Sequence, residues 1–498
     1  MSLARSFSRN LSFILWSRIL SAAVNLTFLG VAARHFGVVN FGKLVFILAT
    51  TSFMELAFCG SADSILTREQ ARHTGDWRQN FWACIFLHGC FALTAAMATV
   101  SLAVYWRSDW ILSRGLILAG MASAFQILFA IPVAFFRAEQ KMSFEATLIT
   151  AERIFFLAGF LAIVIRRGPM VAIFGLLALS MGMKAMAAYL WFFRRWPIGS
   201  FRPQLDKLGY LFRESVPMMG VALLLSVHCR VDLFFTKAMA SAEQLGIYAA
   251  SFRVFEMLRV LPVDVITAAF PIFCSMVSGR DGADKDKQQA RFQGTYTVFV
   301  RLGLILAVLG TGVGVLYAGY GTRLLFGASF GGTVAPARIL LLAFPLMFWS
   351  QINNITLTAT GRQRFMFYVL LAVVGCQTVV DVLFVPRAGA LGAGAAFLTG
   401  EAIMLMGTLA AIAPLTLGLK QSLRTAGKLV AVSIAACLLG LRVHTSSAWV
   451  LALFLGAFVL LIFLFRVLTE QDVSSLKQGA IRAWRSVRGP VAVETVGT

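Results

Sequence analysis

Residues 216–237 read VPMMGVALLLSVHCRVDLFFTK, and the class of fold can be inferred from this segment outward. The run from 218 to 227 is apolar apart from one glycine and one serine. A helix needs about 20 mostly apolar residues to cross a bilayer, and this segment is long enough. Full charges nevertheless occur within it, at Arg230 and Asp232. Such a pattern is typical of a membrane-spanning helix that turns one or more faces toward polar neighbours inside a bundle.

The composition of the whole chain agrees with this interpretation. The 498 residues are 59% hydrophobic and only 13% charged, whereas soluble domains are about 45–50% apolar and about 25% charged. The formal charge of +22 is typical of basic cytoplasmic loops, and it does not lead us to expect a nucleic-acid partner. The seven cysteines form no CxxC or Cys/His spacing, so we expect no disulfide framework, metal site or cofactor.

Hydropathy predicts an all-α polytopic membrane protein with about fourteen transmembrane helices. Lys and Arg are concentrated in the loops on the side shared by the N-terminus and the C-terminal tail, which predicts that both ends are cytoplasmic. The predicted spans are 11–33, 41–62, 81–105, 111–136, 143–166, 169–193, 216–239, 244–275, 295–319, 334–359, 365–386, 389–416, 424–441 and 447–467.

A weak internal repeat predicts two lobes. FGKLVFILA (41–49) resembles LGIYAASFR (245–253), and RRGPMVAIFG (166–175) resembles PRAGALGAGA (386–395). Matched segments are an even number of spans apart in chain order, so the two lobes share one orientation in the membrane. The alternative is chance similarity between apolar segments. The predicted parts are an N-lobe (1–193, helices 1–6), a basic cytoplasmic linker (194–215), a C-lobe (216–416, helices 7–12), helices 13–14 (417–467) and a cytoplasmic tail (468–498). The later linker forms either a short amphipathic surface helix or a solvated connection.

Charged residues inside the predicted spans are the main functional signal, because each would be costly if it faced lipid. Arg230 and Asp232 point about 200° apart on a helix, so they do not pair with each other, whereas His228 shares the face of Asp232. Arg253, Glu256 and Arg259 form a ladder on one helix in which one acid lies between two bases. Arg153 and Lys184 are expected to be paired or to snorkel to the interface.

Several arginines around one cavity suit a phosphate-bearing ligand, because guanidinium groups match phosphate oxygens. The candidate substrate-binding residues are Arg18, Arg230, Arg253, Arg259 and Arg301. The alternative is that they only tie helices together. The candidates for ion coupling or charge pairing are Glu55, Asp232, Glu256, Asp264, Asp381 and Glu401. For Glu55, Asp381 and Glu401 we expect a cation on another helix as partner. No nucleophile elbow, P-loop or acidic metal cluster occurs, so no enzymatic activity is predicted.

Three stretches resemble a known family. They are NLTFLGVAARHFGVVNFGKLVFILATTSF (25–53), RVDLFFTKAMASAEQLGIYAASFRVFEMLRVLPVDVITAAFPIF (230–273) and ILLLAFPLMFWSQINNITLTATGRQRFMF (339–367), the last followed by FVPRAGALGAGAAFLTGEAIM (384–404). Together they resemble the polysaccharide transport branch of the multidrug/oligosaccharidyl-lipid/polysaccharide (MOP) exporter superfamily, which includes Wzx-type flippases. The resemblance extends over nearly the whole chain and consists of pattern rather than of one invariant motif.

The resemblance implies two lobes around a cavity and transport by alternating access. It implies a cargo, an undecaprenyl-diphosphate-linked oligosaccharide for exopolysaccharide or O-antigen synthesis, and a location in the bacterial inner membrane. Membrane lipid is then a partner, and a polysaccharide polymerase and export machinery are further candidate partners. The alternatives are a lipid II-type flippase, an ion-coupled exporter similar to the multidrug antiporters, a membrane polymerase or ligase of lipid-linked sugars, and a scaffold for envelope assembly.

Overall fold

A computed structural model describes residues 3–59, 66–67, 77–139, 141–196, 205–278, 285–415, 422–431, 451 and 454–460. Within these ranges the regular structure is helical throughout, as predicted. The elements are α1 (Leu3–Cys59), α3 (Trp77–Tyr105), α4 (Trp110–Ala138), α5 (Met142–Ile165), α6 (Val171–Arg195), α7 (Leu205–Met239), α8 (Ala242–Ser278), α9 (Lys285–Phe326), the 3-10 helix η1 (Ala328–Thr333), α10 (Val334–Ala359), α11 (Gln363–Ala388) and α12 (Ala390–Ile412).

Ten helices in the described part of the chain are long and apolar enough to cross a membrane. Most of the predicted spans 424–441 and 447–467, and all of the tail 468–498, lie outside the described residues. The number of fourteen spans, the cytoplasmic placement of both termini and the boundaries of the two predicted lobes therefore stay predictions.

The first two predicted spans form one long element with a sharp break. Inside α1, Gly37 has φ 71° and ψ 175°, which divides the element into two helices. A positive φ of this kind is readily adopted only by glycine, so the chain changes direction there without a separate loop. The apolar residues on either side of Gly37 are numerous enough for two spans, which explains why hydropathy predicted two segments here.

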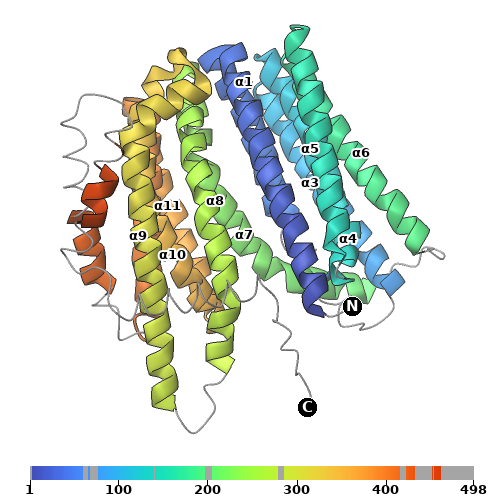
Figure 1. Cartoon of the computed structure of the whole chain (residues 1–498). Coiled ribbons are helices and arrows are strands. Elements are labelled where there is room, and N and C mark those ends of the chain that lie inside the picture. The colour runs from blue at the N-terminus through green and yellow to red at the C-terminus, as the bar shows by residue number, and fades with distance from the viewer. Residues whose placement is uncertain are drawn as a thin grey trace, which may run out of the picture. The chain divides into compact units, whose positions relative to one another are not determined.

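The chain divides into two compact units, each of which is described by itself. The first unit comprises residues 1–257, 319–340 and 363–404, and the second comprises 258–318, 341–362 and 405–498. In the first unit, α4 packs against α1, α3, α5 and α6, and these helices run side by side in Figure 1. Gly120 lets α4 approach α3 closely, because a Cβ there would lie 2.0 Å from Thr99 Oγ1. Small residues at such crossings are a common means of packing membrane helices.

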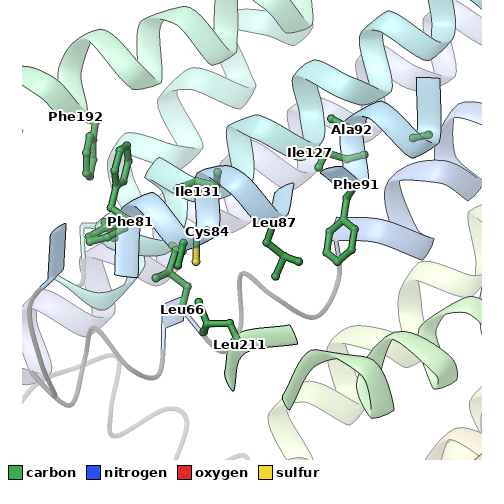
Figure 2. Packing of buried hydrophobic residues seen from close by; sticks show 14 of the residues in the cluster. Leu66, Phe81, Cys84, Leu87, Phe91, Ala92, Ile127, Ile131, Phe192 and Leu211 are labelled. Atoms are coloured by element: carbon green, nitrogen blue, oxygen red, sulfur yellow. The ribbon is translucent and has the colours of Figure 1, made fainter. Parts of the chain in front are cut away.

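An aromatic and aliphatic core holds α3, α4 and α6 together at one end. Phe81 stacks on Phe192 with ring centroids 4.7 Å apart, and both rings are fully buried. Figure 2 shows this core, which also includes Ile131 of α4 and Leu211 of α7. Leu211 belongs to residues 205–215, which are helical and continuous with the α7 span. The later part of the predicted linker is thus helical, but it continues the α7 helix instead of forming a separate short helix, and its position at the membrane surface stays a prediction.

The two segments that suggested the repeat touch each other inside the first unit. A Cβ on Gly42 would lie 2.7 Å from the backbone nitrogen of Gly246, and a Cβ on Gly246 would lie 2.1 Å from the carbonyl oxygen of Val38. In the proposed repeat Gly42 and Gly246 occupy equivalent positions. The helices therefore meet backbone to backbone, and neither position has space for a side chain.

In the second unit, α9 and the second half of α10 pack through glycine and aromatic residues. A Cβ on Gly303 would lie 2.4 Å from the ring of Phe348. A buried polar chain also joins this unit: Trp349 Nε1 donates to the Tyr296 hydroxyl (3.0 Å), which donates to Asn353 Oδ1 (2.7 Å). The Asn353 amide in turn donates to Thr408 Oγ1 (3.1 Å). Satisfied polar groups of this kind fix the mutual rotation of neighbouring helices.

Candidate functional site

Two arginines and one glutamate form an ion cluster between α7 and α8. Glu256 Oε1 lies 3.1 Å from Arg230 Nη2, and Glu256 Oε2 lies 2.6 Å from Arg253 Nη1. The Arg230 guanidinium also lies 5.7 Å above the ring centroid of Phe252. The three charged side chains are 14–20% exposed, so they are largely but not completely withdrawn from the surface. One acid between two bases leaves a net positive charge.

This arginine cluster retains a donor that the protein does not use. Arg253 Nε is buried and has no hydrogen-bond acceptor among the described residues. A guanidinium presents five N–H donors in a planar fork, which suits a phosphate or carboxylate group. The cluster therefore has both the charge and a free N–H group to bind an anionic ligand.

On the opposite face of α7, His228 and Asp232 take part in a second group of buried residues. We name this group the α7 cluster, and its members are His228, Asp232, Tyr248, Gln377, Asp381 and Glu401. Every member of it is less than 5% exposed. Arg230 and Asp232 thus have different partners, as the helical spacing predicted, because residues two apart point to nearly opposite sides of a helix.

Gln377 of α11 organises the α7 cluster. Its amide nitrogen donates to Asp232 Oδ1 (2.6 Å) and to the His228 carbonyl (3.1 Å), while its oxygen lies 2.7 Å from His228 Nδ1. The Tyr248 hydroxyl donates to Asp232 Oδ2 (2.9 Å). His228 Nε2 lies 3.2 Å from Glu401 Oε1. His228 and Asp232 share a face as predicted, but Gln377 bridges them, since it can donate to one and accept from the other.

Asp381 differs from the other members because its neighbour is another acid. Its carboxyl interacts electrostatically with that of Asp232, and neither of its oxygens has a hydrogen-bond donor among the described residues. The sequence led us to expect a cation on another helix as its partner. Two buried carboxyl groups this close cannot both carry a negative charge unless a proton or a cation lies between them. Such a pair favours a shared proton or a bound cation.

Five sequence-predicted candidates remain. Glu55 interacts electrostatically with Lys184 and Arg153, so its partners are on other helices as expected. Arg259 of α8 and buried Arg301 of α9 lie in the second unit, whereas the arginine cluster lies in the first. The side chains of Arg18 in α1 and Asp264 in α8 lie outside the described part of the structure.

The sequence prediction of the site does not include Tyr248 and Gln377, because it rests on charged residues inside the spans and these two side chains are uncharged. Gln377 precedes Asp381 by four residues, which places both on one face of α11. Tyr248 lies in the LGIY segment at the start of α8. A search for amides and hydroxyls one helical turn from each intramembrane acid would have found Gln377, but not Tyr248, which meets Asp232 only through the packing of α8 on α7.

Comparison with known proteins supports the fold and the general class. A sequence profile described as polysaccharide biosynthesis protein matches residues 7–277. No protein with a curated description matches the chain significantly.

Solved structures show the same fold at low sequence identity. A structure described as lipid II flippase MurJ in an inward closed conformation superposes with a TM-score of 0.72 and 12% identity, over 92% of this chain and 98% of that one. A multidrug resistance MATE family transporter of the MOP superfamily, inward-facing, has a TM-score of 0.63 and 11% identity, over 79% and 94%. A MOP superfamily transporter from Pyrococcus furiosus has a TM-score of 0.54 and 12% identity, over 83% and 94%.

Proposed function

This chain belongs to the family of polysaccharide biosynthesis proteins, and from that premise we propose that it translocates a lipid-linked oligosaccharide across a membrane by alternating access. It is a multi-pass membrane protein whose fold is shared by flippases and transporters. The proposed cargo is an undecaprenyl-diphosphate-linked repeat unit for exopolysaccharide or O-antigen synthesis, and the proposed location is the bacterial inner membrane. A polysaccharide polymerase and export machinery are the proposed partners downstream.

The arginine cluster carries this proposal. Arg230 and Arg253 share a single acid and are largely withdrawn from the surface, so an anionic group that binds there gains from low dielectric screening. A diphosphate supplies several oxygens for the guanidinium donors, including the unused Arg253 Nε. Glu256 then holds both arginines in place and cancels only one of their two positive charges. We extend the same role to Arg18, Arg259 and Arg301.

Energy coupling is assigned to the α7 cluster. Among the described residues Asp232 has two hydrogen-bond donors and Asp381 has none, so in this proposal the carboxyl pair binds one monovalent cation, a proton or a sodium ion. Gain or loss of that cation changes the charge between α7 and α11, and this change of charge moves one helix relative to the other. Glu401 pairs with His228 and belongs to the same proposed site. Roles for Glu55 and Asp264 in coupling stay predictions.

The test removes the side chains of Arg230 and Arg253 and leaves the rest of the protein unchanged. In a strain that depends on this protein, the double variant R230A/R253A should lose at least about nine-tenths of the surface polysaccharide at an unchanged protein level in the membrane, because removal of charge-assisted hydrogen bonds to phosphate costs about 1.5–3 kcal/mol each. Wild-type polysaccharide in this variant would refute the proposal. A loss of polysaccharide that follows a loss of protein would mean that the arginines only tie helices together.

A matched control comes from an ion pair outside the cluster. Arg137 of α4 lies 2.6 Å from Glu145 of α5, and the arginine side chain is 39% exposed. R137A removes one arginine from an interhelical ion pair in the same way, but it should leave the polysaccharide level near that of the wild type. Flux measured in vesicles with a diphosphate-linked oligosaccharide and, separately, with lipid II would distinguish the two cargo classes.

A further inference from the structure

Another buried charge cluster lies among the first six predicted spans, which precede the residues of the arginine cluster and the α7 cluster in the sequence. We name it the α6 cluster: Glu55 of α1, Gln126 of α4, Glu152 and Arg153 of α5, and Lys184 of α6. Its central member is Lys184, whose side chain is 5% exposed. A buried lysine is uncommon unless its ammonium group is paired or solvated by polar atoms.

The surroundings of the Lys184 ammonium resemble the coordination shell of a monovalent cation. Nζ donates to Gln126 Oε1 at 2.8 Å, lies 3.7 Å from Glu152 Oε2 and lies 4.9 Å from the centroid of the Phe129 ring. A neutral amide oxygen, a carboxylate and an aromatic face are all groups that attract a small cation. They come from α4 and α5, and the ammonium reaches them on the flexible stem of a residue from α6.

The acids of this cluster retain binding capacity. Glu152 has a side chain that is 1% exposed; Ser180 Oγ approaches its Oε1 at 3.5 Å, but its Oε2 has no hydrogen-bond donor among the described residues. Arg153 Nε lies 3.7 Å from that same oxygen. Glu55 interacts electrostatically with Glu152, Arg153 and Lys184, and its Oε1 is also buried without a donor. Two acids and two bases sum to zero, so loss of the ammonium would leave one net negative charge.

From this geometry we infer that the α6 cluster is a monovalent-cation site whose resident occupant is the chain's own Lys184 ammonium. Because the ammonium group is covalently attached to the chain through the Lys184 side chain, it stays in the site. The site therefore gives the stability of the wild type no dependence on external ions. Removal of the ammonium opens the same oxygens and the Phe129 face to a free cation such as Na⁺ or methylammonium. The inference concerns ion binding by the first unit and does not depend on the cargo.

The test is a thermal-stability titration of the purified full chain. K184A is titrated with NaCl or methylammonium chloride against choline chloride at constant ionic strength, beside the wild type and the double variant E152Q/K184A. We expect a saturable rise in Tm in K184A that exceeds the wild-type response by about 2 °C or more, because a ligand that binds only the folded state stabilises it. In E152Q/K184A the response should return to that of the wild type. Any cation bound at the α7 cluster affects all three proteins equally.

Two outcomes would overturn the inference. The first is a folded K184A whose Tm responds to Na⁺ and methylammonium no more than the wild type does. The second is an equal gain in E152Q/K184A, which would place the binding elsewhere. If K184A is too unstable to purify, K184Q, which keeps an N–H donor toward Gln126, is titrated in its place, and an absent response there also refutes the inference. R137A, which breaks a half-exposed pair between α4 and α5, should show no extra response.

Discussion

The α6 and α7 clusters contain similar groups but differ in how their charge is balanced. Each buries at least two carboxyl groups, one amide side chain (Gln126 or Gln377) that is hydrogen-bonded to the basic residue, and an aromatic ring beside that residue. In the α6 cluster the counter-charges are Lys184 and Arg153, which the chain itself supplies. In the α7 cluster the only basic side chain among the described residues is His228, and it faces Glu401 rather than the Asp232–Asp381 pair.

This difference separates a structural role from a switching role. A buried charge is tolerated when a partner and hydrogen bonds compensate its loss of hydration. The α6 cluster meets this condition with covalently attached partners, so it is suited to a constant state. Under the proposed coupling, the α7 cluster meets it when a mobile proton or cation joins the two aspartates, and its state would change with the gain or loss of that cation.

The largest effect should come from removal of the tethered cation. K184M leaves Glu152 buried beside Arg153 alone, and the loss of one partner of a buried ion pair typically costs about 3–5 kcal/mol in the free energy of unfolding. The double variant E152Q/K184M removes both charges and should recover most of that loss. Denaturation of both proteins in detergent measures the difference. If the single and double variants were equally stable, the pair would not be a coupled unit.

The two aspartates of the α7 cluster should respond in opposite ways. D232A deprives the Tyr248 hydroxyl and the Gln377 amide of their acceptor, at about 1–3 kcal/mol for each buried donor. D381N instead introduces an N–H donor facing Asp232, so its stability should equal or exceed that of the wild type. Thermal denaturation measures both.

A transport measurement completes the comparison of Asp232 with Asp381. D381N should lose the dependence of flux on the coupling ion even though it is stable, because the site no longer needs a cation. Flux in vesicles with and without an imposed ion gradient would reveal this. A D381N variant that is as unstable as D232A would show that Asp381 is an ordinary structural acceptor.

A smaller effect on stability should arise at the contact between α1 and α8. The α1 helix carries Glu55 of the α6 cluster, the α8 helix carries Tyr248 of the α7 cluster, and the two helices approach each other at Gly42 and Gly246. G246A places a methyl group against the Val38 carbonyl and should destabilise the protein by about 1–3 kcal/mol. Gly375 of α11 has open space beside it, so G375A should be neutral or up to about 1 kcal/mol more stable, because alanine favours a helix. Equal effects from both substitutions, measured by Tm, would contradict the close contact.

The smallest effect concerns an ion pair at the surface. Lys43 Nζ lies 2.6 Å from Asp109 Oδ2, and Asp109 also caps α4 by accepting from the backbone N–H groups of Ile111 and Leu112. Partial burial alone would raise the pKa of Asp109, but the Lys43 ammonium and the Leu112 N–H outweigh it and hold the pKa below its ordinary value. The contribution to stability is therefore present above about pH 4 and is lost as the pH falls further.

D109N tests this contribution. Asparagine remains a good N-cap but carries no charge, so D109N should lack part of the acid-induced fall in Tm between about pH 5 and pH 3. D109A, which lacks the cap as well, should be less stable than D109N at every pH. A D109N profile parallel to that of the wild type would show that the Lys43 pair contributes nothing in this range.

Helical spacing predicted part of the site correctly. It separated Arg230 from Asp232, and it placed Glu256 where it reaches Arg253 on the same helix. It did not predict that Glu256 also meets Arg230, or that Asp381 has an acid as its neighbour, because these contacts join helices whose rotation about their own axes hydropathy does not specify. Lys184 was expected to be paired or to snorkel, and only the packing of α4, α5 and α6 shows how many groups surround its ammonium.

Composition and hydropathy are sufficient to establish a helical membrane protein, since a bilayer accepts only long apolar segments whose backbone hydrogen bonds are satisfied internally. The quoted stretches are likewise sufficient to suggest a polysaccharide family, and the profile match shows that the chain belongs to the polysaccharide biosynthesis proteins. Which buried charges are balanced by the chain, and which need a mobile ion, depends instead on the three-dimensional packing. Charge interactions act across a few ångströms between helices that are distant in sequence, so a partner such as Gln377 for Asp232 becomes apparent only after the helices have been brought together.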